Sequence, residues 1–441
     1  MNAPSAIDIG RYLSTIDQAL PVSSKGRVKE VIGLLVRAIV PEARIGELCL
    51  IYNSRSSMAV KAEVVGFQAG DVLLMPLGEL AEFGPESEVV PTGRSLTIRV
   101  GDALLGRVLD GLGEPMDGAE KGPLDCFEEY PVYARPPNPL QRSRIKKSIS
   151  IGVRAIDSLL TCGEGQRIGL FAAAGVGKST LLGMIARNTE ADVNVITLVG
   201  ERGREVRDFL EESLGEAGLK RSVVVCATSN EPSLVRLKAA YVGTAIAEYF
   251  RDRGKRVLLM MDSVTRFARA QREVGLASGE PPARAGYTPS VFAELAKLLE
   301  RTGNSDKGSI TAFYTVLVAG DDMNEPVADE VRSILDGHII LSRELAAHGH
   351  FPAIDVLDSV SRVMPAITDS AHQQAARKMR DVLATYAKQK DLILLGAYQS
   401  GSDLKVDFAI SKIGAVNSFL QQSVDDRPSA AQTLEQLKSL F

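Results

Sequence analysis

The segment FAAAGVGKST at residues 171–180 has the glycines, lysine and hydroxyl side chains of a loop that binds phosphate groups. An apolar run precedes it and a helical pattern follows it, which is the setting that such a loop requires. Gly175 and Gly177 let backbone N–H groups face the phosphates, and the helix N-terminus adds a positive field. Lys178 would reach the β- and γ-phosphates, and Ser179 would place its hydroxyl on Mg²⁺. The expected nucleotide contacts are Ala174, Gly175, Val176, Gly177, Lys178, Ser179 and Thr180.

A second candidate is the apolar run VLLMMD at residues 257–262, which ends in a carboxylate. At the carboxyl end of a strand, Asp262 would bind a water molecule of the Mg²⁺ shell. An apolar strand that ends in Asp is common, so this pattern is weak by itself. In the same domain as the phosphate loop, it becomes a strong indication of nucleotide hydrolysis.

The sequence GERGREV at residues 200–206 follows another apolar run, so its carboxylates should lie at the same sheet edge as the phosphate loop. Hydrolysis needs a group that orients and polarises the attacking water. Glu201 is the candidate for this role, with Glu205 as a helper. A surface network of salt bridges with Arg202, Arg204 and Arg207 explains the same charges equally well, and the spacing does not decide between the two.

Arg362 lies in DVLDSVSRVMP, residues 355–365, beyond the last of the apolar strand runs. Considered alone, an arginine at such a position is more typical of an ordinary surface charge. A catalytic role for Arg362 therefore depends on family resemblance.

Between residue 166 and about residue 342, apolar strand runs alternate with helical patterns. This alternation predicts an α/β domain whose parallel sheet is covered by helices on both faces. The expected strands are 167–171, 193–199, 223–227, 257–261, 310–318 and 338–341.

The flanking regions differ from this pattern. Residues 27–100 contain short β-rich runs between Gly and Pro turns, which predicts a small barrel or sandwich. Residues 6–20 carry apolar side chains at three- and four-residue steps, as an amphipathic helix would, and plain packing or docking to a partner or membrane both remain open. The expected barrel strands are 31–40, 47–52, 60–67, 72–75 and 96–100, and the expected parts are an N-terminal helical segment 1–25, a β-barrel 26–98, an ATPase domain 99–368 and a C-terminal helical domain 369–441.

The composition is that of an ordinary globular protein. The 441 residues include 51 basic and 55 acidic side chains, a formal charge of −4 that indicates no polyanion-binding surface. Four cysteines (Cys49, Cys126, Cys162, Cys226) and four histidines show no metal-ligand spacing. The N-terminus lacks the pattern of a secretory signal and no run of eighteen apolar residues occurs, so we expect a cytoplasmic protein.

Taken together, GVGKST, GERGREV, LLMMDSVTRFARAQRE and FPAIDVLDSVSR resemble the catalytic subunits of rotary ATP synthases and their export-ATPase relatives. The resemblance extends from residue 27 to residue 422. It implies an N-terminal β-barrel, a RecA-like P-loop domain and a C-terminal helical domain. It also implies a homohexameric ring that hydrolyses ATP with Mg²⁺ at a site on each interface.

The resemblance further implies roles for single residues. Glu201 becomes the carboxylate that activates water, with Arg202 in its network. Arg362 becomes an arginine finger that enters the neighbouring subunit's site and stabilises charge on the γ-phosphoryl group. Phe351 would stack on adenine, although a core aromatic is the simpler alternative, and Gln422 would close the other side of the base pocket.

Several segments resemble the type III secretion ATPases in particular, among them RIGELC (44–49), NPLQR (138–142) and GDDMNEPVADEVRSILDGHIILSR (320–343). The runs LLTCGEGQRIGLFAAAGVGKST and RVLLMMDSVTRFARAQREVGLASGEPP are more similar to the injectisome branch than to the flagellar branch. Synthase subunits engage their rotor through an acidic loop, which GAYQSGSD (396–403) replaces here. Coupling to a central stalk therefore does not follow from the resemblance alone.

On this resemblance the ring would energise protein export by releasing chaperones from effectors and unfolding them at the export gate. Its partners would be other copies of the chain, a central stalk protein, a stator or regulator, and chaperone–effector complexes, at the cytoplasmic face of the bacterial inner membrane. A nucleic-acid motor is disfavoured, because it would need a basic groove with exposed aromatics. A non-catalytic ring subunit is disfavoured because Lys178, Glu201, Asp262 and Arg362 are all present.

Overall fold

The computed structural model describes residues 25–53, 59–79, 83–85, 87–318, 320 and 322–441. The chain divides into two units, Met1–Leu96 and Thr97–Phe441. The amphipathic helix expected over residues 6–20 lies outside the described residues.

The first unit contains a closed antiparallel barrel with the strand order β1-β2-β5-β4-β3-β6. Alternate side chains of its strands, such as Val36, Ile51 and Val64, fill a small apolar core, as the two-residue period of a strand requires. The strands are β1 Gly26–Ile32, β2 Leu35–Ile39, β3 Glu47–Tyr52, β4 Ala59–Gln68, β5 Asp71–Pro76 and β6 Glu88–Ser95. The predicted barrel is therefore confirmed.

Two details of the strand prediction for the barrel were wrong. The run 31–40 is split by a hairpin turn at Gly33, whose φ of 57° suits glycine. The run 96–100 lies outside the barrel, because β7 (Thr97–Val100) pairs with β9 (Glu128–Pro131) in the second unit. The sixth barrel strand is instead β6, whose Pro91 and Gly93 are residues that normally indicate turns.

The second unit is built on a nine-stranded, mostly parallel sheet with the order β17-β16-β10-β15-β13-β11-β12-β8, to which β14 adds beside β15. Six of its strands correspond to the predicted apolar runs. Its strands are β8 Val108–Asp110, β10 Arg167–Ala172, β11 Val193–Glu201, β12 Ser222–Thr228, β13 Arg256–Asp262, β14 Gly303–Asn304, β15 Ser309–Leu317, β16 Gly337–Leu341 and β17 Ile354–Ser361. Because β10, β11 and β13 are parallel, the functional residues that follow them meet at one edge, which we call the carboxyl edge.

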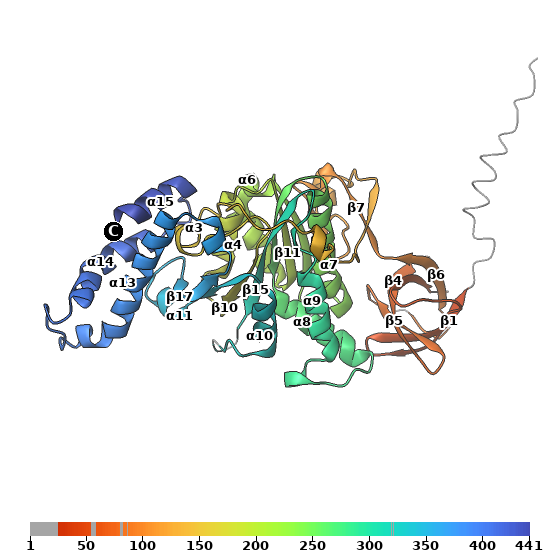
Figure 1. Cartoon of the computed structure of the whole chain (residues 1–441). Helices are drawn as coiled ribbons and strands as arrows, with labels where there is room; N and C mark the ends of the chain where they lie inside the picture. Colours follow the sequence, from red (N-terminus) through yellow and green to blue (C-terminus); the bar gives the residue numbers. More distant parts are fainter. Residues whose placement is uncertain (1–24, 54–58, 80–82, 86, 319, 321) are drawn as a thin grey trace, which may run out of the picture. The chain divides into compact units, whose positions relative to one another are not determined.

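Helices cover both faces of this sheet, as the sequence predicts (Figure 1). One face packs against α7 (Ser233–Asp252) and α8 (Val264–Ala277), and the other contributes to a core with α3 (Arg154–Leu159) and α4 (Lys178–Asn188). The remaining helices are α2 Gly118–Lys121, α5 Gly203–Asp208, α6 Gly215–Leu219, α9 Pro289–Leu299, α10 Pro326–Ile334, α11 Arg343–Ala347 and α12 Met364–Ile367.

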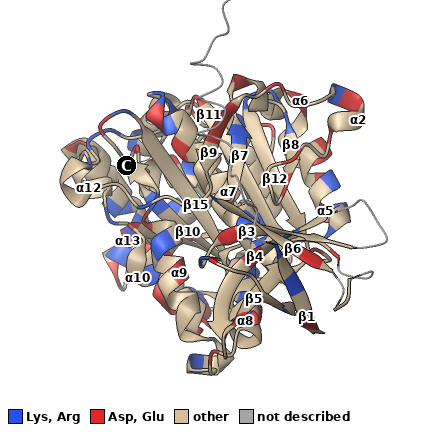
Figure 2. Ribbon diagram, turned by 90° about the vertical axis from the view of Figure 1, so that its right-hand side faces the viewer, with Lys and Arg blue, Asp and Glu red and all other residues tan. Residues whose placement is uncertain are grey.

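The chain ends in three helices that pack beside α3, namely α13 (Ser370–Leu394), α14 (Leu404–Leu420) and α15 (Ala430–Ser439). Their apolar residues join the same core as α3 and α4, so the helical part is continuous with the nucleotide-binding part. Among the described residues, no helix has both the length and the apolar character needed to cross a membrane. Charges of both signs are interspersed over the elements, in keeping with the small net charge (Figure 2).

Candidate functional site

The phosphate loop joins the end of β10 to the first turn of α4. Gly175 and Gly177 have φ angles of 83° and 84°, the left-handed region that glycine adopts without strain. Ala174, Ser179 and Thr180 are exposed, whereas Val176 is buried and anchors the loop in the core. The loop therefore presents its backbone and hydroxyl groups to solvent at a helix N-terminus, as a phosphate site requires.

Lys178 and Asp262 come from neighbouring parts of the carboxyl edge and form an ion pair. The Asp262 carboxylate also accepts a hydrogen bond from the Thr315 hydroxyl at 2.7 Å, which fixes it at the end of β13. Lys178 Nζ lies 3.9 Å from Glu201 Oε1 as well. The structure thus brings together the predicted lysine and both predicted carboxylates.

Glu201 ends β11 and is almost completely buried, so it is not part of an exposed salt-bridge network. Its carboxylate accepts a hydrogen bond from Arg266 Nε at 3.1 Å. Gly200 makes this approach possible, because a Cβ there would lie 2.8 Å from Arg266 Cδ. Burial, the negative charge of Asp262 and a hydrogen bond with Glu205 raise the pKa of Glu201 to about 6, against the lowering effect of Lys178 and Arg266. A carboxylate in this range is suited to accept a proton near neutral pH.

Arg202, expected in the network of Glu201, makes no direct ion pair with it and reaches it through Glu205. Its side chain is 72% exposed and forms an ion pair with Glu205. Arg202 occupies the N-cap of α5, where the chain turns outward from the end of β11. The cation hydrogen-bonded to Glu201 is Arg266, in the first turn of α8, and Lys178 lies slightly farther away.

Arg362 lies at the opposite edge of the sheet from the phosphate loop. Strand β16 is parallel to β10, whereas β17 is antiparallel to β16 and pairs Ser361 with Gly337, the first residue of β16. Arg362 follows Ser361 and is therefore at the amino edge, where β10 and β16 begin. The length of β10 separates this edge from the phosphate loop by roughly 15 Å. Its guanidinium is exposed and donates to the Arg332 carbonyl at 3.4 Å.

Phe351 lies against the phosphate loop and is 45% exposed, so it is not a core aromatic. A Cβ at Gly177 would lie 3.5 Å from its ring. Gln422 is beside it, because the Gln422 N–H donates to the Phe351 carbonyl at 2.9 Å. The Gln422 side chain, however, bonds Arg154 N and the Gly152 carbonyl, at 2.8 and 2.9 Å. The Gln422 side chain therefore joins the C-terminal helices to α3. Its amide is already bonded, so it is not available to close the adenine pocket as we had expected.

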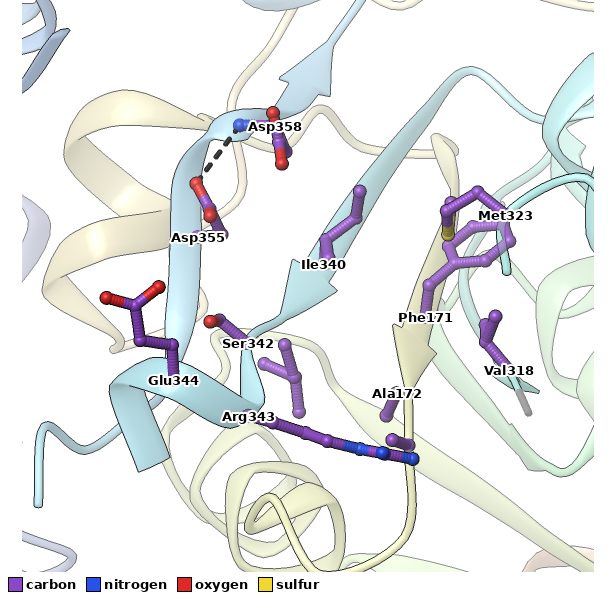
Figure 3. A pocket seen from close by; sticks show the side chains of 12 residues that line it. Phe171, Ala172, Val318, Met323, Ile340, Ser342, Arg343, Glu344, Asp355 and Asp358 are labelled. Atoms are coloured by element: carbon purple, nitrogen blue, oxygen red, sulfur yellow. Dashed lines mark hydrogen bonds between the residues drawn. The ribbon is translucent and has the colours of Figure 1, made fainter. Parts of the chain in front are cut away.

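A pocket of about 270 Å³ adjoins the residues that lead into the phosphate loop (Figure 3). Phe171, Ala172 and Met323 line one side, and the carboxylates of Glu344, Asp355 and Asp358 line the other. Arg343 also lines the pocket, but the three carboxylates outnumber its single positive charge and would repel a triphosphate, so the phosphates belong over residues 174–180.

The donors present are compatible with Mg²⁺. Among the described residues, no group of three or more His, Cys, Asp or Glu side chains could hold a metal ion alone. Mg²⁺ in nucleotide sites is bound by one or two protein oxygens together with substrate phosphates. The Ser179 hydroxyl and the buried Asp262 carboxylate supply that set.

Two residues of this site were missed by the sequence analysis, Arg266 and Thr315. Arg266 lies four residues after Asp262, so the start of the following helix could have indicated it. Thr315 lies within an apolar strand, and only the order of the strands, with β15 between β10 and β13, shows that it faces Asp262.

Comparison with family models matches three stretches of the chain. Residues 152–361 match the nucleotide-binding domain of the ATP synthase alpha/beta family, and residues 28–93 match its beta-barrel domain. Residues 368–439 match the C-terminal domain of the T3SS EscN ATPase.

Individual relatives are similar over almost their whole length. The flagellum-specific ATP synthase of Bacillus subtilis is 57% identical over 94% of both chains. The type 3 secretion system ATPase of Xanthomonas euvesicatoria is 56% identical over 94% of this chain and 93% of its own. The assembled ATPase EscN of enteropathogenic E. coli, solved in complex with its central stalk EscO, is 49% identical over 94% of this chain and 99% of that one, with a TM-score of 0.87. The chain therefore belongs to the EscN-type export ATPases of type III secretion, within the ATP synthase alpha/beta family of nucleotide-binding proteins.

Proposed function

We propose that this export ATPase hydrolyses Mg²⁺-ATP at sites shared between neighbouring copies in a homohexameric ring. The separation of the functional residues supports this most strongly. Lys178, Glu201 and Asp262 lie together at the carboxyl edge, whereas Arg362 is exposed at the amino edge of the same sheet. An arginine so placed cannot serve its own phosphate loop, but it can complete that of an adjacent copy.

In the proposed reaction, water attacks the γ-phosphorus and the bond to the β,γ-bridging oxygen breaks, giving ADP and phosphate. Glu201 orients the water and accepts its proton, Lys178 binds the β- and γ-phosphates, and Arg362 of the neighbouring copy stabilises charge on the transferred group. Mg²⁺, held by Ser179 and through Asp262, would neutralise charge on the same phosphates. Arg266 keeps Glu201 in place, and the exposed Phe351 ring stacks on adenine, with Gln422 fixing Phe351 through its backbone.

Mixing two inactive variants tests the shared site. Glu201→Ala removes the water-activating carboxylate and Arg362→Ala removes the finger, and each alone should lose about 10³-fold or more in turnover. In an equimolar mixture, one half times one half, or about a quarter, of the interfaces join an intact site to an intact finger. We expect ATPase activity to return towards that fraction. A mixture as inactive as its components would contradict the proposal.

The proposed role in the cell is to drive type III protein export at the inner membrane, by chaperone release and unfolding of effectors at the export gate. A flagellum-specific relative is as similar as the secretion-system one, so flagellar export is the second candidate. Central-stalk contact would use the connection between α13 and α14, which exposes Leu394, Leu395 and Leu404. Such a contact would depend on apolar burial and not on the acidic loop of the synthases.

A further inference from the structure

The backbone of Arg362 is held at a corner formed by the starts of β10 and β16 and the end of β17. The Arg362 N–H donates to the Asp336 carbonyl at 3.0 Å. Its side chain is exposed at the same corner. The position of the guanidinium therefore depends on what fixes Asp336 and the last residue of β17, Ser361.

Gln166, the residue before β10, bonds both of these partners through a fully buried amide, with 0% exposure. Its Nε2 donates to the Asp336 carbonyl at 3.2 Å and to the Ser361 hydroxyl at 3.1 Å. Its Oε1 accepts from the Gly163 N–H at 2.9 Å. Every polar atom of the amide is used, so a shift of any partner would leave a buried group unpaired.

We call the hydrogen bonds of Gln166 to Asp336 and Ser361 the Gln166 clamp. Two neighbouring residues hold it tightly and rigidly. Arg167 donates from its N–H and Nε to one Asp336 carboxylate oxygen, at 3.0 and 3.1 Å. Gly337 leaves the room for β17 to approach, because a Cβ there would lie 2.6 Å from the Val360 carbonyl and 3.2 Å from Gln166 Nε2. Hydrogen bonds thus fix the segment that bears Arg362 to the start of β10, the strand that leads to the phosphate loop.

We propose that Gln166 is a positioning residue for the arginine finger. The Gln166 amide fixes the position from which Arg362 reaches the site of the neighbouring copy. It takes no part in the site of its own subunit, which lies at the other end of β10. This inference rests on the proposed function, in which Arg362 acts across an interface. It predicts that loss of the Gln166 amide affects only the finger-donating side of a subunit.

Gln166→Met tests this, because it keeps the side-chain volume and removes the amide. Displacing a catalytic group by about 1 Å can lower turnover roughly 10²-fold, and we expect a loss of that order with ATP binding unchanged. Mixing Gln166→Met with Glu201→Ala should restore activity, since the Glu201→Ala copies supply intact fingers. Mixing it with Arg362→Ala should not, since neither copy supplies one.

Ser361→Ala probes the same clamp at a half-buried position and should give the same mixing pattern with a smaller loss, even if Gln166→Met does not fold. Asn194→Ala is the matched control, since it removes another fully buried amide, bonded to the Ala186 carbonyl and Ser222. It should lower thermal stability and keep turnover.

The positioning role alone would be overturned by the following result. Arg362→Ala regains activity when mixed with Glu201→Ala, but neither Gln166→Met nor Ser361→Ala does. Failure of the Arg362→Ala mixture as well would overturn the shared site, and the positioning role with it.

Discussion

At the scale of single residues, the environment of Glu201 determines its chemistry. The sequence places a carboxylate after a strand, but it cannot show whether that carboxylate pairs with exposed arginines or is buried. In the structure, burial and the nearby Asp262 raise its pKa to about 6, and Arg266 holds it in place. The adjacent Arg202 points outward to Glu205. Glu201 and Arg202 are consecutive charged residues, but one faces the phosphate loop and the other faces solvent. This difference depends on the path of the chain after β11, which the sequence pattern does not show.

This pKa predicts the pH dependence of hydrolysis. Glu201 accepts a proton only when ionised, so kcat/KM for ATP should fall as the pH drops through about 6. Arg266 lowers the pKa of Glu201, so Arg266→Met should raise that pKa and move the acid limb of the profile to higher pH. Arg204→Met, at an 89% exposed side chain on the same segment, should leave the limb in place. A limb that does not respond to Arg266→Met would show that it belongs to another group.

At the scale of elements, the sequence predicts the features that depend on a local residue pattern. It misses the features that depend on which strands pair with each other. The phosphate loop, the strands that lead to Lys178, Glu201 and Asp262, and the presence of a barrel follow from apolar runs and glycine spacing. Strand β17 was not predicted, because two aspartates interrupt its apolar pattern and its hydrogen bonds come from β16. The opposed positions of Arg362 and the phosphate loop follow from the direction of β17, which no local pattern encodes.

The helical layer contains a fully buried ion pair between Arg301, which follows α9, and Glu248 on α7. Arg301 also donates to the Val132 carbonyl at 2.8 Å, so the pair ties the connector after β9 to both helices. Glu248→Ala would leave Arg301 as an uncompensated buried charge and should lower the free energy of unfolding by about 3–5 kcal/mol. Chemical denaturation measures this change.

Glu216→Ala serves as the control for that measurement, because Glu216 forms an exposed pair with Lys220. We expect no measurable change in its unfolding midpoint. Equal midpoints for Glu248→Ala and Glu216→Ala would mean that the buried pair does not hold this layer together.

At the scale of the whole molecule, one sheet separates the two groups of residues that we propose to form a shared catalytic site. Its carboxyl edge carries the phosphate loop and Glu201, the proposed water-activating carboxylate, and its amino edge carries the exposed Arg362. Copies arranged head to tail would place these edges against one another, and six such contacts would close a ring. The C-terminal helices share the core of α3 and α4, so movements of the nucleotide-binding part would pass directly to the end formed by α13 and α14.

The most direct test of this account is the specific ATPase activity of the wild-type chain as a function of its concentration, with Lys178→Ala as the inactive control. A site completed by a neighbouring copy exists only after assembly, so specific activity should rise steeply with concentration and then level off. Dilution of an active sample should abolish the activity reversibly. Specific activity that stays constant down to concentrations at which the chain is monomeric would contradict the account, because a single copy would then hydrolyse ATP without its neighbour's arginine.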